Sequence, residues 1–251
     1  DSVISEDPGH RGALDIMTSI FEANQDFARL ANVLNEGLQS ASNPAEEIEV
    51  RIRLGSICEK QLGDVAAAKN HYEKAVLLNP SCLDALRGLD RIYLKEGNKA
   101  ALRDNLEAQL TCEMTPNQKI ETRVRLADLY EEEFKNADKA VHHLEAVVTA
   151  DDSNRYALLT LTRLYRRLER WEDLAAVLEK RAKFASDDEK KGLLKERADV
   201  IRDKLKDSAR AIQALTEVTS LGVDDALESL AKTQEEAGDF ESAVSTLQKI
   251  S

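Results

Sequence analysis

The sequence has few aromatic, glycine and proline residues. Aromatic residues make up 4% of the 251 positions, and only 10 Gly and 4 Pro are present. That is too little glycine and proline for a disordered chain or a loop-rich β protein. The 42% of hydrophobic residues are mainly Leu, Ala, Ile and Val. We therefore expect thin layers of closely packed helices instead of one large globular interior.

Cysteine is also scarce, and the 35 basic residues are outnumbered by 47 acidic ones. Cys58, Cys82 and Cys112 lie far apart and form no CxxC pair, which indicates reduced thiols instead of a disulfide framework or a zinc site. The formal net charge of −12 disfavours nucleic acid and anionic membrane surfaces as partners.

The sequence contains no segment that is typical of membrane insertion or secretion. No apolar run approaches the ~18 residues of a membrane span, and no signal peptide opens the chain. We expect no membrane insertion and a cytoplasmic location. The first residue is Asp1, so a targeting segment that has been cut away remains an alternative.

No motif of catalysis or cofactor binding is present. The sequence lacks HExxH, G-x-S-x-G, the P-loop and G-x-G-x-x-G. The 47 acidic residues produce close pairs by chance on amphipathic helices. We therefore predict that the chain is not an enzyme and has no metal and no cofactor.

What the sequence does contain is an internal repeat. Arg51-Ile-Arg-Leu54 returns as Arg123-Val-Arg-Leu126, and 123 − 51 gives a shift of 72. The same shift places Tyr93 on Tyr165 and His71 on His143. A fixed period over this length indicates a repeat array.

Apolar residues recur at helical spacing along nearly the whole chain, and no run of period two is convincing. Turn-forming clusters interrupt the pattern every ~15–20 residues. The segments between them predict fourteen helices in seven antiparallel pairs. Ser81, Ser153 and Ser186 stand where a side-chain oxygen would cap a helix start.

One helix pair has a specific signature, formed by Leu54-Gly55, Cys58, Gly63-Asp64, Ala68, Tyr72, Ala75 and Asn79-Pro80. It resembles the tetratricopeptide repeat, with one extra residue between Leu-Gly and Gly-Asp and with Cys58 in place of the usual aromatic. The resemblance, especially to long bacterial arrays, implies an all-α, right-handed superhelical solenoid. We expect residues 1–251 to form a single solenoid domain that is a fragment of a longer array.

The repeat units alternate in length. The equivalent small or apolar site falls on Leu30, Ala68, Leu102, Ala140, Leu174, Ala211 and Ala243, with successive differences of 38, 34, 38, 34, 37 and 32. The residue four positions later lies on the same helix face and is expected to fill the gap to the next pair. The last helix keeps an apolar face at Val244, Leu247 and Ile250.

The candidate site is electrostatic. In the family, the first helix of each pair lines a concave surface that holds peptides or partner helices. Two such predicted helices carry basic rows, which are Arg87, Arg91 and Lys95, and Arg163, Arg166 and Arg167. The helix between them carries Asp128, Glu131 and Glu132. Two interpretations stay open: this acidic helix supplies the counter-charge, or the basic rows hold an acidic or C-terminal carboxylate ligand.

These observations predict a protein–protein interaction scaffold that binds a peptide segment or a partner helix in its concave groove. One alternative is a structural array in which copies stack end to end. Another is a regulatory arm of an enzyme whose catalytic domain lies outside these residues.

Overall fold

The computed structural model describes residues 11–39 and 41–250, and this part of the chain is all α-helical, with fourteen α-helices. Within it, no helix is long and apolar enough to cross a membrane. The chain divides into two compact units, Asp1–Thr122 and Arg123–Ser251. The boundary falls inside helix α8, Pro116–Glu132. The prediction of one continuous domain over residues 1–251 stays a prediction.

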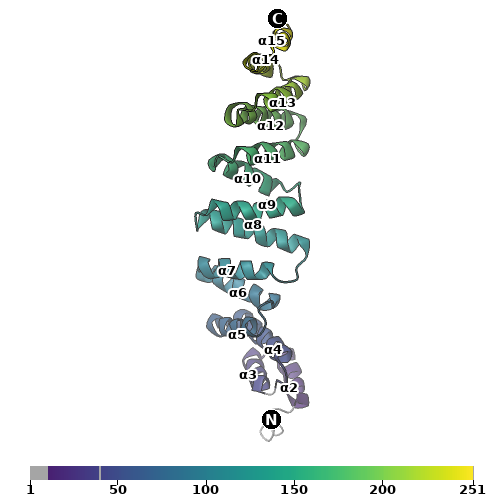
Figure 1. Cartoon of the computed structure of the whole chain (residues 1–251). Helices are drawn as coiled ribbons and strands as arrows, with labels where there is room; N and C mark the ends of the chain where they lie inside the picture. The colour runs from purple at the N-terminus through teal and green to yellow at the C-terminus, as the bar shows by residue number, and fades with distance from the viewer. Residues whose placement is uncertain (1–10, 40, 251) are drawn as a thin grey trace. The chain divides into compact units, whose positions relative to one another are not determined.

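The first unit contains three helix pairs (Figure 1). Their bounds are α2 Arg11–Ala23 with α3 Phe27–Gln39, α4 Pro44–Ile57 with α5 Val65–Leu78, and α6 Leu83–Glu96 with α7 Lys99–Leu110. A short π-helical turn, η1 Cys58–Leu62, extends α4. Connections of a few residues between contacting neighbours give antiparallel pairs.

The second unit contains the remaining pairs (Figure 1). They are α8 with α9 Ala137–Ala150, α10 Arg155–Arg167 with α11 Trp171–Lys183, α12 Asp187–Val200 with α13 Ser208–Ser220, and α14 Leu227–Glu236 with α15 Phe240–Leu247. The π-helical turn η2 Ile201–Leu205 extends α12, and the 3₁₀ turn η3 Asp224–Ala226 precedes α14. We call α2, α4, α6, α8, α10, α12 and α14 the first helices and their partners the second helices.

After each first helix, one residue adopts the left-handed backbone conformation, and the residue that follows it is the N-cap of the second helix. Glycine takes the left-handed position at Gly63, Gly97 and Gly238, whereas Gln25, Lys135, Glu169 and Lys206 adopt it with φ between 51° and 58°. In most pairs the next residue is Asp or Asn, and its side chain accepts a backbone N–H of the second helix, as Asp64 does from Ala67 at 2.9 Å. This turn fixes the reversal within each pair.

The predicted alternation of long and short units is present in the first helices. The long ones are α4 with η1 (14 and 5 residues), α8 (17) and α12 with η2 (14 and 5), while α6 and α10 have 14 and 13. In long units the N–H after the left-handed residue reaches back six residues, as from Asp64 to Cys58. In short units it reaches back five, as from Asn98 to Tyr93. A π turn absorbs one extra residue, so η1 is where the additional residue of the second pair resides.

The repeated sites form the core. Leu30, Ala68 and Ala140 are at most 1% exposed, and four positions further on Tyr72 and Leu144 are also at most 1% exposed. The Tyr72 ring is held between two glycines, since a Cβ on Gly55 or Gly88 would lie 2.6 or 2.5 Å from it. Around Leu144, the repeat-equivalent positions are occupied by Ala127 and Thr160.

Two of the expected serine caps are wrong. The cap before α6 is Cys82, without a side-chain hydrogen bond, and the cap before α10 is Asn154, which accepts from the Ala157 N–H at 3.1 Å. The N–H groups of Ser81 and Ser153 instead donate to the side chains of Asn79 and Asp151. Each of these two serines therefore lies in an Asx turn that begins at Asn79 or Asp151. Ser186 is at the cap position of α12 but makes no side-chain cap bond.

Candidate functional site

Neighbouring first helices within each unit are joined by ion pairs. In the first unit, Arg53 on α4 pairs with Glu22 on α2 at 2.5 Å. Arg91 on α6 then reaches η1, where its Nε and Nη2 donate to the two carboxylate oxygens of Glu59 at 2.8 and 2.7 Å. A bidentate contact of this kind fixes the plane of the guanidinium group as well as its position.

Glu59 is the buried partner of this pair. Its side chain is 4% exposed, against 45% for Arg91. The Tyr72 hydroxyl also donates to Glu59, at 3.1 Å. The hydrogen bond from Arg91 lowers the pKa of Glu59, and burial opposes this shift. The carboxylate thus holds the guanidinium of Arg91 at the surface with half of it facing solvent.

The second unit repeats this contact at the equivalent positions of the sequence. Arg163 on α10 donates from Nη1 and Nη2 to the two oxygens of Glu131 on α8, at 2.5 and 2.7 Å. Arg167 approaches the same carboxylate at 3.2 Å. Glu131 is 13% exposed, whereas Arg163 is 57% and Arg167 is 51% exposed. The hydrogen bond from Arg163 lowers the pKa of Glu131.

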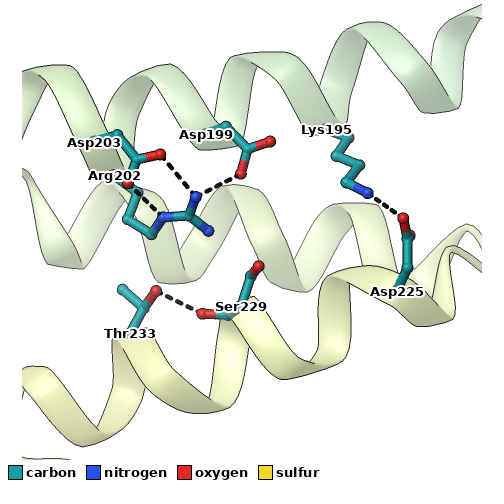
Figure 2. Close-up of polar contacts among 7 residues, drawn as sticks. All are labelled: Lys195, Asp199, Arg202, Asp203, Asp225, Ser229 and Thr233. Atoms are coloured by element: carbon teal, nitrogen blue, oxygen red, sulfur yellow. Dashed lines mark hydrogen bonds and ion pairs between the residues drawn. The ribbon is translucent and has the colours of Figure 1, made fainter.

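The other helices of the second unit continue the pattern. Arg166 on α10 pairs with Glu196 on α12, and Lys195 on α12 pairs with Asp225 on η3. Figure 2 shows Lys195 pointing toward Asp225, and Arg202 lying between Asp199 and Asp203. Arg202 donates to Asp203 at 2.7 and 2.8 Å. Each step from one first helix to the next in this unit therefore carries at least one ion pair.

Two of the six proposed basic residues differ from the others. Within the described chain, Arg87 and Lys95 on α6 form no ion pair, Arg87 being half-buried and Lys95 exposed. The row Arg87, Arg91 and Lys95 is therefore neutralised only at its centre. The counter-charge of Arg91 comes from η1, not from the acidic helix that the sequence interpretation assigned. That helix, α8, supplies the counter-charge only to Arg163 and Arg167.

Two exposed residues on α10 were missed by the sequence interpretation. Tyr156 is 48% and Leu159 is 42% exposed, and Tyr156 donates to Asp128 on α8. Burial of the ring and the nearby Asp128 carboxylate raise the pKa of Tyr156 to about 12. The spacing of Tyr156, Leu159 and Arg163, at i, i+3 and i+7, places them on one helix face. This helical spacing is the sequence signal that could have identified Tyr156 and Leu159 as neighbours of Arg163.

A shallow hollow adjoins Leu159. Its volume is about 210 Å³. The residues that line it include Leu158 and Leu159 of α10, and Arg181 and Phe184 at the end of α11. Phe184 is 52% exposed. The hollow combines an apolar lining with charged groups, and it is open enough to receive a side chain of a ligand.

The described residues hold no cluster of three or more His, Cys, Asp and Glu side chains that would bind a metal ion. The repeat-equivalent histidines differ in burial, with His143 3% exposed and stacked on Tyr130 at 5.5 Å between ring centroids. Stacking between helices is a packing role for this side chain.

Paired antiparallel helices with buried sites repeating every two pairs define a helical-repeat solenoid. Tetratricopeptide-repeat family models match residues 48–82 and 157–191. These two segments are therefore tetratricopeptide repeats. Repeats of this family serve as protein–protein interaction scaffolds.

Solved structures give distant matches, and curated proteins give none. A tetratricopeptide repeat protein from Parabacteroides merdae is 16% identical, with 95% of this chain and 91% of that chain covered and a TM-score of 0.47. MamA is 19% identical over 66% of this chain and 95% of its own, with a TM-score of 0.42. YrrB, described as a tetratricopeptide repeat protein with an unusual peptide-binding site, is 16% identical over 88% and 91%, with a TM-score of 0.38.

Proposed function

We propose that this chain is a non-enzymatic scaffold that binds an acidic peptide segment along the first helices of its second unit, with α10 as the main contact. The observation that carries the proposal is the face of α10. It exposes an aromatic ring at Tyr156, an aliphatic side chain at Leu159, and the guanidinium groups of Arg163, Arg166 and Arg167, all three of which are at least half exposed. Aromatic and arginine side chains are the residue types that dominate binding energy at protein interfaces.

The ion pairs prepare the arginines for a ligand. A guanidinium group has five N–H donors, and the bidentate contact of Arg163 with Glu131 uses two of them. Because Glu131 holds the guanidinium in place, a ligand carboxylate would bind without first ordering a long side chain. Glu131 contacts both Arg163 and Arg167, so one positive charge of this trio has no balancing charge within it.

The row on α6 belongs to the first unit and is a separate candidate site. Arg87 and Lys95 are without an ion pair in the described chain, and they flank the neutral pair of Arg91 and Glu59. Their positive charge would favour a carboxylate ligand at that site as well. The hollow beside Leu159 and Phe184 would take an apolar side chain of the peptide that α10 binds.

The test is a selection followed by direct binding. Peptides selected from a random displayed library are labelled and titrated with the chain by fluorescence anisotropy. We expect acidic peptides with an apolar residue, and affinity at least tenfold weaker after Arg163→Ala or Arg167→Ala, since a hydrogen bond to a charged group contributes ~1.5–3 kcal/mol. Tyr156→Ala should weaken binding as well.

Arg210→Ala is the matched control. Arg210 is on the second helix α13, is 45% exposed, and makes a bidentate pair with Glu172 at 2.9 and 3.0 Å. Its loss should leave peptide affinity unchanged. Selected peptides without carboxylates, or an equal effect of Arg163→Ala and Arg210→Ala, would contradict the proposal.

A further inference from the structure

Arg155 extends the basic face of α10 by one helical turn beyond Leu159. It is the first residue of α10, it is exposed, and it forms no ion pair in the part of the chain that the structure describes. Arg155, Leu159 and Arg163 follow one another at intervals of four residues, so they lie one turn apart on the same side of the helix. The exposed leucine is thus placed between two guanidinium groups.

The hollow beside Leu159 is also lined by Arg155. Phe184, which is 52% exposed, gives the hollow an apolar lining. Arg181 lines it as well, but its charge is balanced by Glu189 at 3.3 Å. An apolar side chain in this hollow would therefore lie beside one cation, Arg155, that has no counter-charge within the described chain.

The two neighbouring first helices present carboxylates to α10. They are Asp128 and Glu131 on α8 and Glu196 on α12, which contact Tyr156, Arg163 and Arg166 respectively. The cations Lys195 and Arg202 of α12 are themselves paired with carboxylates (Figure 2). An acidic peptide that crossed from α10 onto either neighbour would bring its carboxylates toward like charges, which is unfavourable. A peptide that follows α10 would stay over its cations.

The spacing along α10 fits an extended peptide. Four residues of an α-helix rise about 6 Å, and two residues of an extended chain span about 6.6 Å. Side chains two positions apart point to the same side of an extended chain. Alternate side chains of such a peptide would therefore meet Arg155, the hollow beside Leu159, and Arg163 in turn. Because four residues exceed one helical turn by about 40°, the peptide would run at a small angle to the helix axis.

We infer that the ligand is an extended peptide that follows this row of α10 and has the pattern acidic–x–apolar–x–acidic, where x is any residue. The inference rests on the proposed function and adds the direction of the peptide, its spacing and the role of Arg155. The apolar residue fills the hollow beside Leu159, and the two acidic residues pair with Arg155 and Arg163. A third acidic residue, two positions beyond the one at Arg163, reaches Arg167.

Peptides of identical composition, labelled and titrated by fluorescence anisotropy, test the spacing. One contains Glu-Ser-Leu-Ser-Glu, and the others contain Glu-Leu-Ser-Ser-Glu or Ser-Glu-Leu-Glu-Ser. We expect the first to bind at least tenfold more tightly, because a shift of one position turns a side chain to the opposite face of an extended chain. Equal affinity of the three peptides would overturn the inference.

A double-mutant cycle tests which glutamate meets which arginine. Arg155→Ala should weaken binding of the first peptide at least fivefold, and replacing one of its two glutamates with serine should remove most of this effect. The other glutamate should be coupled to Arg163→Ala in the same way. Lys180→Ala removes an exposed basic residue of the second helix α11 and is the control, which should leave the affinity unchanged. Affinity independent of Arg155, or no coupling with either glutamate, would overturn the inference.

The failure of this inference can be distinguished from the failure of the proposed function. If acidic peptides of every spacing bind equally and all lose affinity with Arg163→Ala, α10 is the binding site and only the pattern is wrong. If no acidic peptide depends on Arg163 or Arg167, the proposed function is wrong and this inference is wrong with it.

Discussion

The packing of Tyr72 between two glycines predicts that the effect of one substitution, Gly88→Ala, on stability depends on whether Tyr72 is present. Gly88 is in the interior of α6, where alanine would ordinarily stabilise the helix by about 1 kcal/mol. The added Cβ, however, would lie 2.5 Å from the Tyr72 ring, well inside the ~3.5–4.0 Å of a normal carbon contact. The ring cannot move away, because a Cβ on Gly55 would lie only 2.6 Å from its other side.

We therefore expect Gly88→Ala to destabilise the fold by about 2 kcal/mol. This value is the upper part of the overpacking cost, about 3 kcal/mol, less the gain in helix propensity. In a Tyr72→Leu background the same substitution should become neutral or stabilising by up to about 1 kcal/mol, because the smaller side chain makes room for the Cβ. The chain already contains such a combination, since Leu144, Ala127 and Thr160 stand at the repeat-equivalent positions of the second unit.

Hydrogen exchange read by mass spectrometry on α5 and α6 peptides suits this measurement, since repeat arrays unfold in parts and one global midpoint does not define their stability. Gly192→Ala is the matched control. It also lies inside a helix, but its Cβ would meet nothing within 4 Å, so it should slow exchange in α12. If Gly88→Ala had the same effect in the wild-type chain and in the Tyr72→Leu background, the steric argument would be wrong.

Two further predictions concern the turns and the buried carboxylates. Lys206→Gly and Lys135→Gly should each stabilise the helices that flank the turn by about 1 kcal/mol, measured by hydrogen exchange, because these residues adopt φ of 58° and 51°. Gly97 has φ of 65° and open space around the position of a Cβ, so Gly97→Ala should lower the stability of its neighbouring helices by a similar amount. Unchanged stability in all three variants would refute the strain argument. For Glu59, the Arg91 contact lowers the folded pKa, so its stabilisation is present above the ordinary carboxyl pKa of about 4.3 and is lost as the pH falls through the folded pKa. Glu59→Gln should thus be less stable than wild type at pH 7 but lose less stability between pH 5 and pH 3, and parallel pH profiles would contradict this assignment.

The repeat and the helix pairs could be predicted because every pair solves the same packing problem. Ala68 and Ala140 are small where two helices approach, and the residue four positions later is large, so the pattern returns at a fixed shift. The extra residue between Leu54-Gly55 and Gly63-Asp64 was also visible in the sequence. Its place in a π turn was not, because an insertion there is equally compatible with a longer loop.

The partners of the arginines could not be predicted from helical spacing alone. Arg87, Arg91 and Lys95 follow one another at i, i+4 and i+8, yet only Arg91 forms an ion pair within the described chain. Which carboxylate a side chain reaches depends on how the neighbouring helix packs beside its own, and the spacing of residues within one helix does not give this. The serine caps failed for a related reason, since Asn79 and Asp151 compete for the same backbone groups.

The alternation of five-residue and six-residue turns determines how many helix pairs can be removed from or added to such a chain at once. Removing one helix pair would bring two turns of the same kind together and would remove the ion pairs that the deleted first helix makes with its neighbours, such as that of Arg91 on α6 with Glu59. Removing or duplicating two consecutive pairs as a block would keep both the turn sequence and the spacing of Glu59 with Arg91 and of Glu131 with Arg163. Two consecutive helix pairs are therefore the smallest block that can be deleted from or added to an engineered chain without changing this pattern.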